Sequence, residues 1–438
     1  LHVLAAIPDW TAAGFHFTMS AEAIQFAPGE RSDAASHPLC TRGKIVDLRL
    51  SERVARVKPS PTMAVTAKAA ELKRAGRDII GLGAGEPDFD TPPHICEAAI
   101  EAIRAGRTRY TAVEGILELR QAICDKFRRD NAIEYQPDQV LVSNGAKQSL
   151  YNLCVALLGP GDEAIVPAPY WVSYPDMVLL AEATPVVVAA GPDQHFKITP
   201  EQLEAAITPR TRLLFLNSPS NPTGVAYSAA ELAGLAEVLR RHPQVLVTTD
   251  DIYEHIYWGD EPFSSLLTVA PDLHEQVVTV NGVSKVYAMT GWRIGYAAGP
   301  RKLIGAMKKI QGQSTSNPNS IAQYASLAAL TGDQGCIAEM RAAFRQRHDW
   351  LLEALNSLPG FRCLPADGAF YAFPDVSDAI AALDGVEDDT AFAGYLLEKA
   401  GVAVVPGTAF GAPGHERLSY ACSLDTLEQA VERIRGVL

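Results

Sequence analysis

Short apolar runs alternate with longer amphipathic stretches over most of the chain. Each run is bounded by glycine, proline or polar residues, as expected of strands buried in a sheet. Between the runs, the spacing of apolar positions predicts helices, among them 94–106, 115–130 and 145–158. Because strands alternate with helices, we predict an α/β fold whose large domain has three layers, α/β/α, with a mainly parallel sheet. The predicted strands are 139–143, 163–167, 184–189, 212–217, 245–250, 277–282 and 294–299.

The pattern differs on either side of this region. Residues 63–78 have helical spacing with a stop at Gly76, and the apolar run that follows leads into a glycine-rich turn. The C-terminal part combines a long helix at 334–357, short strands near 361–373 and 402–405, and a closing helix from Leu424. We therefore expect a large domain at 94–330 and a smaller α+β domain built from 47–93 and 331–438.

Residues 1–46 show no sustained helical or strand periodicity. A secretory signal needs basic residues before a clean apolar run, but residues 1–10 hold no Lys or Arg and are interrupted by Pro8 and Asp9. A transit peptide is also disfavoured, because acidic residues intervene among the few basic ones. We expect a disordered extension or an over-called start.

Composition limits the possible functions. The chain has 438 residues, 47% of them hydrophobic and 20% charged, which is globular and long enough for more than one core. Its 51 acidic and 38 basic residues give a net charge of -13, which disfavours nucleic acid and anionic membranes as partners. The seven cysteines lack disulfide-like or metal-like spacing. We expect buried thiols, no metal and a cytoplasmic location.

Three polar motifs follow predicted strands: SPSNPTG at 218–224, TTDDIYE at 248–254, and NGVSKVYAMTGWRIGY at 281–296. In an open α/β sheet, ligands bind at the carboxyl ends of the strands, so the motifs should share one crevice. In this order and spacing they resemble the fold-type I pyridoxal-phosphate enzymes, specifically the class I aminotransferases related to aspartate aminotransferase. The resemblance runs from about residue 50 to the C-terminus and implies pyridoxal 5'-phosphate as cofactor.

The resemblance assigns Lys285 as the Schiff-base lysine, which burial and cationic neighbours must keep partly neutral. Asp250 would hold the proton on the cofactor's pyridine nitrogen. Alternation along an extended segment points Asp251 the other way. A helix cap or turn is the alternative role for Asp250. Tyr253 and Asn221 would donate hydrogen bonds to the cofactor's ring oxygen, although Asn-Pro is also a common turn signal.

The cofactor's phosphate needs local donors, because the chain as a whole is acidic. Arg293 can make a bidentate contact, and Ser284 supplies a hydroxyl. The turn before the helix at 145–158 offers main-chain amides at Gly145, Ala146 and Lys147.

Two aromatic residues complete the family's cofactor site. Tyr110 resembles the tyrosine that reaches the phosphate of the neighbouring subunit, which implies a homodimer with shared sites. Trp171 is placed like the residue that stacks on the cofactor ring, although an ordinary core aromatic has the same pattern.

Substrate recognition requires a carboxylate clamp, and Arg417 matches the family's arginine for the α-carboxylate. The turn containing Gly85 resembles the mobile loop that closes over substrate, with the Gly85 amide as donor. The segment 56–69 resembles a bacterial and plant branch that uses aspartate with 2-oxoglutarate, some members of which convert prephenate to arogenate. Lys58 and Thr62 match residues near the substrate's distal end, and either Lys58 or Lys147 could instead be a solvated charge.

The expected reaction is a ping-pong transamination between an amino acid and a 2-oxo acid. Two other reactions on the same scaffold remain open: transamination of kynurenine or aromatic amino acids, and β-elimination from cysteine conjugates. An aminotransferase-like sensor domain of a transcription regulator is a third alternative, but residues 1–46 lack the basic helical face of a DNA-binding domain.

Overall fold

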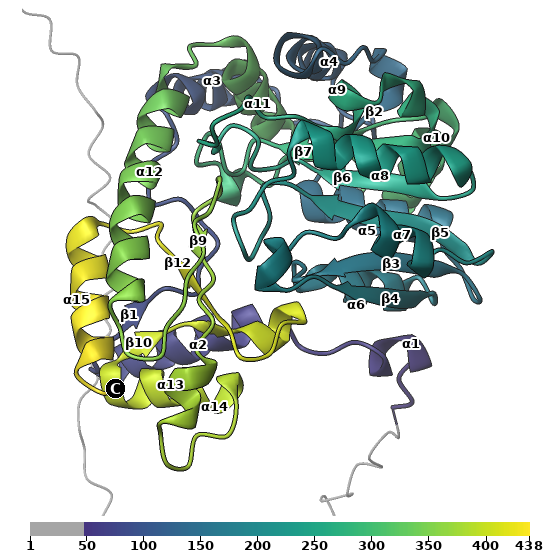
Figure 1. The fold of residues 1–438 in the computed structure, drawn as a ribbon. Helices are drawn as coiled ribbons and strands as arrows, with labels where there is room; N and C mark the ends of the chain where they lie inside the picture. Colours follow the sequence, from purple (N-terminus) through teal and green to yellow (C-terminus); the bar gives the residue numbers. More distant parts are fainter. Residues whose placement is uncertain (1–47) are drawn as a thin grey trace, which may run out of the picture. The chain divides into compact units, whose positions relative to one another are not determined.

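The computed structural model describes residues 48–438, so the predicted extension at 1–46 lies outside the described residues. Residues Leu50–Leu438 form one compact unit. Within that unit, the strands form one seven-stranded sheet and two smaller sheets (Figure 1).

The seven-stranded sheet has the order β2-β8-β7-β6-β5-β3-β4. The five strands from β7 to β4 are parallel, while β8 is antiparallel to both of its neighbours. The prediction of a mainly parallel sheet is confirmed. The strands are β2 (Val140–Ser143), β3 (Glu163–Ala168), β4 (Thr184–Ala189), β5 (Thr211–Asn217), β6 (Leu246–Asp250), β7 (Val277–Gly282) and β8 (Gly295–Ala298).

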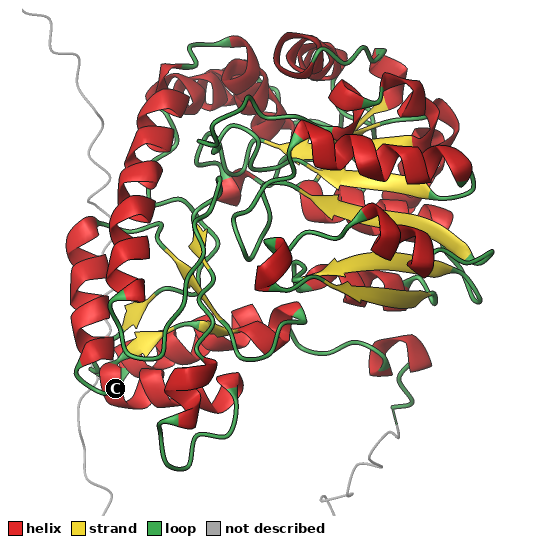
Figure 2. Cartoon of the chain, in the orientation of Figure 1, coloured by secondary structure: helices red, strands yellow, loops and turns green. Residues whose placement is uncertain are grey.

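Helices cover both faces of this sheet (Figure 2). In β5, Leu213 and Phe215 pack into the core under one helical layer, whereas Leu214 and Leu216 belong to the core on the other side. This alternation of apolar residues on both faces is what a sheet buried on two sides requires. One layer holds α5 (Ala146–Leu157), α6 (Ser173–Leu180) and α10 (Arg301–Ser314); the other holds α3 (Pro93–Arg104), α4 (Leu117–Asn131), α7 (Pro200–Ala206), α8 (Ala229–Arg241), α9 (Leu266–Val269) and α11 (Ser320–Thr331).

The smaller sheets lie outside residues 94–330. Strand β1 (Ile80–Gly81) pairs in parallel with β10 (Val402–Ala403), and β11 (Val405–Pro406), β12 (Glu416–Ser419) and β9 (Tyr371–Ala372) form an antiparallel sheet. Of the strands expected near 361–373, only Tyr371–Ala372 forms; Arg362 and Asp375 make an isolated bridge. The helices are α1 (Glu52–Ala55), α2 (Pro61–Arg74), α12 (Gly335–Asn356), α13 (Ser377–Ala381), α14 (Asp389–Tyr395) and α15 (Leu424–Arg435).

One core joins the smaller part to the segment after β6. Ile252, Tyr253 and Ile256 belong to the same buried cluster as Phe344 of α12 and Phe370, which precedes β9. The carboxyl end of β6 is therefore covered by side chains from the C-terminal region, and a site formed there draws residues from both regions.

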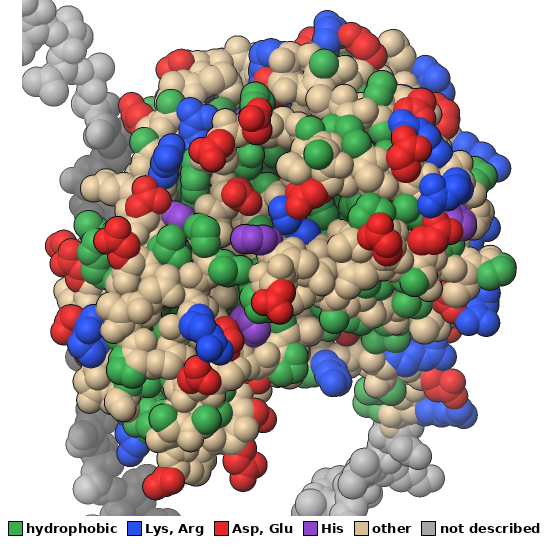
Figure 3. Space-filling model, viewed as in Figure 1, with side chains coloured by type: hydrophobic (Ala, Val, Ile, Leu, Met, Phe, Trp, Pro, Cys, Tyr) green, Lys and Arg blue, Asp and Glu red, His purple; other side chains and the backbone are tan. Residues whose placement is uncertain are grey.

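The expectation of buried thiols is only half right. Cys124, Cys154 and Cys363 are buried, but Cys96, Cys336 and Cys422 are partly exposed; all six of these described cysteines are free thiols. Among residues 48–438, no helix combines the length and apolar character needed to cross a membrane. Acidic and basic side chains are interspersed on the face drawn in Figure 3.

Candidate functional site

A cavity of about 430 Å³ opens at the carboxyl ends of β5, β6 and β7. Further lining comes from the turn at 84–86, the start of α2, the start of α5, the segment 171–173 at the start of α6, and strands β9 and β12. Most predicted site residues line it: Gly85, Ala146, Lys147, Trp171, Asn221, Asp250, Tyr253, Ser284, Lys285, Arg293 and Arg417. The cavity thus brings together motifs that are far apart in the sequence.

Lys285 lies three residues beyond the end of β7, and its ammonium group donates a hydrogen bond to the carbonyl oxygen of Gly85. Burial lowers the pKa of Lys285 to about 8, since the charged form loses hydration. Glu86 opposes this shift, and Arg293 and Arg417 favour it. A lysine with this pKa is partly neutral near physiological pH, as a nucleophilic amine must be.

Asp250 ends β6 and is buried at the cavity. Its Oδ2 accepts a hydrogen bond from Tyr174 Oη at 2.7 Å, whereas Oδ1 has no hydrogen-bond partner among the described residues. Burial raises the pKa of Asp250 to about 6, and the Tyr174 hydroxyl limits the rise. A buried carboxylate oxygen without a donor is suited to a ligand N–H or cation.

Asp251 lies on the other side of the segment, as alternation predicts. It is buried and approached by Thr249 Oγ1 at 3.4 Å. Burial raises its pKa well above the ordinary value, and Glu254 adds to the rise. Asp250 and Asp251 are therefore adjacent in sequence but have different surroundings, and only Asp250 lines the cavity.

Arg417, in β12, is only 2% exposed. Its Nη1 donates to Asn221 Oδ1 at 2.8 Å and its Nη2 to the carbonyl oxygen of Gly83 at 2.7 Å, while Nε has no partner among the described residues. The guanidinium lies over the rings of Tyr371 at 4.6 Å and Phe410 at 4.9 Å. Within residues 48–438 no carboxylate pairs with this buried cation, so the arrangement favours an anionic ligand.

Arg293 and the start of α5 form a second cationic region. Arg293 donates to the carbonyl oxygens of Thr290 at 2.8 Å and Asn144 at 3.2 Å. Gly145 has φ +83°, and a Cβ there would collide with the Arg293 guanidinium. Lys147 lies 4.8 Å from the centre of the Trp171 ring. Free helix amides beside two cations suit a phosphate group.

Three predicted site residues are not part of the cavity lining: Gly145, which precedes Ala146, and Tyr110 and Lys58. Tyr110 is 92% exposed, as a residue serving another subunit would be. Lys58 is exposed and does not line the cavity, although nearby Ser60, Thr62 and Met63 do. Thr62 Oγ1 is buried without a hydrogen-bond partner among the described residues.

Several residues near the site carried no recognisable sequence signal. Tyr371 lies in a two-residue strand, and its hydroxyl is 2.9 Å from that of Tyr253. Glu86 accepts a hydrogen bond from Thr290 Oγ1 at 2.7 Å. The Asn217 side chain accepts a hydrogen bond from the backbone amide of Asn221 at 2.8 Å and donates one to the backbone carbonyl oxygen of Asp250 at 2.7 Å. These two bonds fix the NPTG turn against β6.

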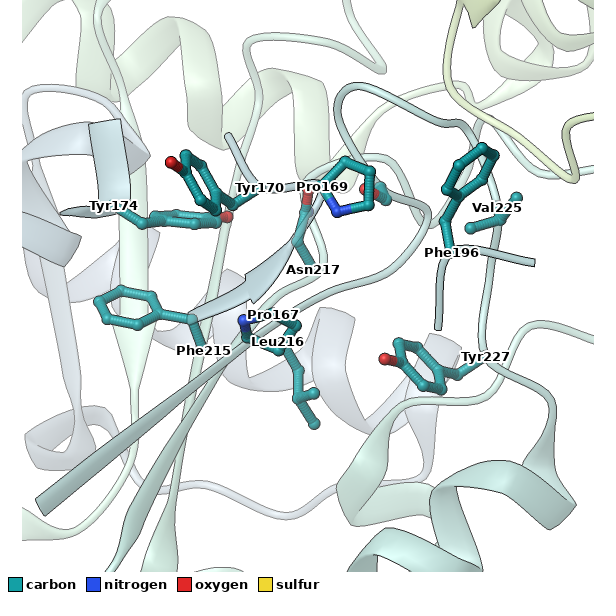
Figure 4. Close-up of a pocket in the computed structure, with 11 residues that line it drawn as sticks. Pro167, Pro169, Tyr170, Tyr174, Phe196, Phe215, Leu216, Asn217, Val225 and Tyr227 are labelled. Carbon is teal, nitrogen blue, oxygen red and sulfur yellow. The ribbon is translucent and has the colours of Figure 1, made fainter. Parts of the chain in front are cut away.

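A separate cavity of about 30 Å³ lies beside residues that contact Asp250 (Figure 4). Tyr174 and Asn217, which both contact Asp250, line it together with Phe215 and Tyr227. Tyr174 stacks on Phe215 at 4.8 Å between ring centres, so its hydroxyl is held in place toward Asp250.

Comparisons with known proteins agree with this geometry. Residues 77–434 match the family described as aminotransferase class I and II. An aspartate/prephenate aminotransferase from Nitrosomonas europaea is 58% identical, over 89% of this chain and 100% of that protein. A second aspartate/prephenate aminotransferase, from Cereibacter sphaeroides, is 59% identical over 88% of this chain and 98% of that protein. The structure of a Thermus thermophilus aspartate aminotransferase with maleate has a TM-score of 0.84 at 48% identity, covering 89% of this chain and 100% of that one.

Proposed function

This chain belongs to the class I and II aminotransferases, and on that premise we propose that it transfers the amino group of aspartate or glutamate to 2-oxo acids such as 2-oxoglutarate, using pyridoxal 5'-phosphate. The observation that carries the proposal is the buried Arg417 guanidinium, which faces the same cavity as Lys285 and Asp250 without a carboxylate partner among residues 48–438. An amino acid supplies the carboxylate that this cation lacks.

The residues present fit the cofactor. Asp250 Oδ1 is an unpaired acceptor for a pyridinium N–H, and Lys285 is a partly neutral amine. Arg293, Ser284 and the amides at the start of α5 would hold the phosphate. Bound there, pyridoxal 5'-phosphate would act as the electron sink that makes the α-hydrogen of an amino acid acidic.

Each residue then has a defined task. Arg417 and Asn221 bind and orient the α-carboxylate, which turns the α-hydrogen toward Lys285. Lys285 Nζ accepts the proton that leaves the α-carbon of the donor, and it supplies a proton to the α-carbon of the acceptor in the second half of the reaction. Asp250, oriented by Tyr174, keeps its negative charge beside the pyridine nitrogen. Because one clamp serves donor and acceptor in turn, the kinetics should be ping-pong.

The turn that carries Gly85 supports a closing movement. The Gly83 carbonyl oxygen accepts from Arg417, and the Gly85 carbonyl oxygen accepts from Lys285. Substrate and cofactor would take up both donors, so the turn must rearrange when they bind. We propose that it closes over the substrate with the smaller domain, through residues 47–93 and 331–438.

We propose dicarboxylic substrates, because the cavity that Arg417 lines also contains a further cation and an unpaired hydroxyl. Thr62 and Lys147 line the cavity, and Thr62 Oγ1 is unpaired. The relatives from Nitrosomonas and Cereibacter act on aspartate and prephenate by name. We extend both substrates to this chain, including the conversion of prephenate to arogenate. Lys58 would have to approach the substrate's distal end during closure.

We also propose a homodimer with shared sites. Tyr110 is almost fully exposed, and Ile103 and Leu117 on the flanking helices are exposed apolar residues. In a dimer, Tyr110 of the partner subunit would reach the phosphate near Arg293. Sedimentation should give a dimer mass, and Tyr110→Phe should weaken cofactor binding without changing that mass.

The proposed function is tested with purified protein, a panel of amino and oxo acids, and the absorbance of the bound cofactor. Aspartate and glutamate should change the absorbance spectrum of the bound cofactor, and 2-oxoglutarate should restore the original spectrum. Lys58→Ala should reduce turnover of dicarboxylates and prephenate more than that of alanine. A strong preference for alanine, kynurenine or aromatic donors would contradict the dicarboxylate assignment, and pyruvate release from cysteine conjugates without an acceptor would indicate β-elimination.

A further inference from the structure

Tyr371 contacts two residues that have different tasks in the site. It begins β9, is fully buried, and lines the cavity. Its ring lies under the guanidinium of Arg417 at 4.6 Å, and its hydroxyl lies 2.9 Å from the hydroxyl of Tyr253. One side chain therefore connects the carboxylate clamp with the tyrosine assigned to the cofactor's ring oxygen.

The ring of Tyr371 restricts where Arg417 can lie. Phe410 packs against the same guanidinium at 4.9 Å, so two aromatic rings hold its position. The attraction between a desolvated cation and an aromatic face is stronger than at an exposed site. Removing the Tyr371 ring would leave Arg417 a wider range of rotamers and weaken carboxylate binding.

The hydroxyl of Tyr371 has a separate role. When Tyr253 donates its proton to the cofactor's ring oxygen, its own oxygen remains an acceptor, and Tyr371 Oη is the described group within hydrogen-bond distance. A hydroxyl that receives a hydrogen bond becomes a stronger donor. Tyr371 would thereby strengthen the bond from Tyr253 to the cofactor.

The same hydroxyl also limits the closing turn. A Cβ built on Gly85 would lie 2.7 Å from Tyr371 Oη, so only glycine fits at this place with Tyr371 present. Tyr371 is therefore in close contact with the turn, the clamp and the cofactor-facing tyrosine.

We propose that Tyr371 is a positioning residue with two separable parts: its ring orients Arg417 for the substrate carboxylate, and its hydroxyl supports Tyr253 at the cofactor. The inference rests on the proposed function, because it needs both the cofactor and a carboxylate substrate. Carboxylate binding by Arg417 and cofactor binding by Tyr253 would then both depend on the side chain of Tyr371.

The first variant is Tyr371→Phe in the holoenzyme, which keeps the ring and removes the hydroxyl. Weaker donation from Tyr253 leaves the negative ring oxygen less stabilised, so the pH midpoint of the bound cofactor's absorbance should rise by roughly half to one unit. The charged or titratable groups Asp250, Lys285, Arg293, Arg417, Glu86 and Tyr253 are all retained. The dissociation constant of succinate, a dicarboxylate that cannot transfer an amino group, should stay within about twofold.

The second variant, Tyr371→Leu, removes ring and hydroxyl together. It should show the same pH shift and should also raise the succinate dissociation constant roughly tenfold. The matched control is Tyr420→Phe, which also removes a buried hydroxyl from the same core but does not line the cavity. It should change neither quantity.

Two results would overturn the inference: an unchanged midpoint in Tyr371→Phe, or unchanged succinate binding in Tyr371→Leu. Equal changes in Tyr420→Phe would also overturn it, because they would show a general packing effect. Failure of the proposed function would look different from failure of this inference. The unmodified protein would then bind neither pyridoxal 5'-phosphate nor succinate, and that result would overturn the proposed function and the inference together.

Discussion

Tyr174 donates a hydrogen bond to Oδ2 of Asp250 at 2.7 Å and leaves Oδ1 of the same carboxylate without a partner among residues 48–438. One oxygen orients the group and the other is available to a ligand. Because Asp251 points away into its own buried surroundings, the two neighbouring acids provide a test of this division.

Asp250→Asn should lower kcat by roughly 10²–10⁴-fold, because an amide cannot hold the proton on the pyridine nitrogen. Asp251→Asn is the control, because Asp251 is buried beside Asp250 but does not line the cavity. Steady-state kinetics on aspartate and 2-oxoglutarate measure both. Equal losses in the two variants would remove Asp250 from the cofactor site.

Lys285→Ala should abolish both the absorbance of covalently bound cofactor and turnover, since no other amine replaces it. Spectra and activity of the purified variant provide the measurement. Lys302→Ala, which changes an exposed lysine of α10, should alter neither. Retention of either property in Lys285→Ala would refute the assignment.

The rate at which cofactor-free protein takes up pyridoxal 5'-phosphate should depend on pH through Lys285. Its pKa is lowered to about 8, so the amine is mostly charged below that pH and mostly neutral above it. The rate constant should therefore rise about tenfold per pH unit below 8 and level off above it. Stopped-flow absorbance measures this, and a plateau reached only near pH 10 would indicate an ordinary exposed lysine.

Arg417→Lys should raise KM for aspartate by roughly 10²-fold, because an ammonium group cannot bind a carboxylate bidentately as the guanidinium can. Arg362→Lys, an exposed change in the C-terminal region, serves as the control. A KM unchanged in Arg417→Lys would show that the α-carboxylate binds elsewhere.

Lys126 and Glu254 form a buried ion pair below the site, and Asn131 and Asn281 donate to Glu254 at 2.7 and 2.6 Å. Lys126→Met leaves the buried Glu254 carboxylate without its lysine partner, so the free energy of unfolding should fall by about 3–5 kcal/mol. Adding Glu254→Gln, which removes the charge but keeps a hydrogen-bond acceptor, should recover part of the lost free energy of unfolding. Urea unfolding of the single and double variants measures this, and an equal or larger loss in the double variant would contradict the charge explanation.

The sequence predicted the sheet because its strands are short apolar runs. The position of the motifs at strand ends predicted a shared crevice, and their resemblance to a known family assigned Lys285, Asp250 and Asn221 to it. Asp251 could be set apart from Asp250 by alternation alone. Tyr371 could not be found in this way, since its strand has two residues and its partners, Tyr253 and Arg417, are 118 and 46 positions away. Long-range pairing of this kind is specified by packing and not by local spacing.

The position of Lys58 shows another limit. Resemblance related Lys58 to the substrate, but the residue is exposed in the stretch before α2 and does not line the cavity. Half of the described cysteines are also less buried than their type suggests, because position in the fold decides burial.

One buried cluster should hold the protein together after proteolysis. It contains Ile252, Tyr253 and Ile256 from the segment after β6, and Phe344 and Phe370 from the C-terminal region. A protease that cuts the exposed turn at Gly332–Asp333 would break the chain between α11 and α12 but leave these apolar contacts intact. The two fragments should remain associated under native conditions and separate only in denaturant, so a nicked enzyme would elute with the intact one.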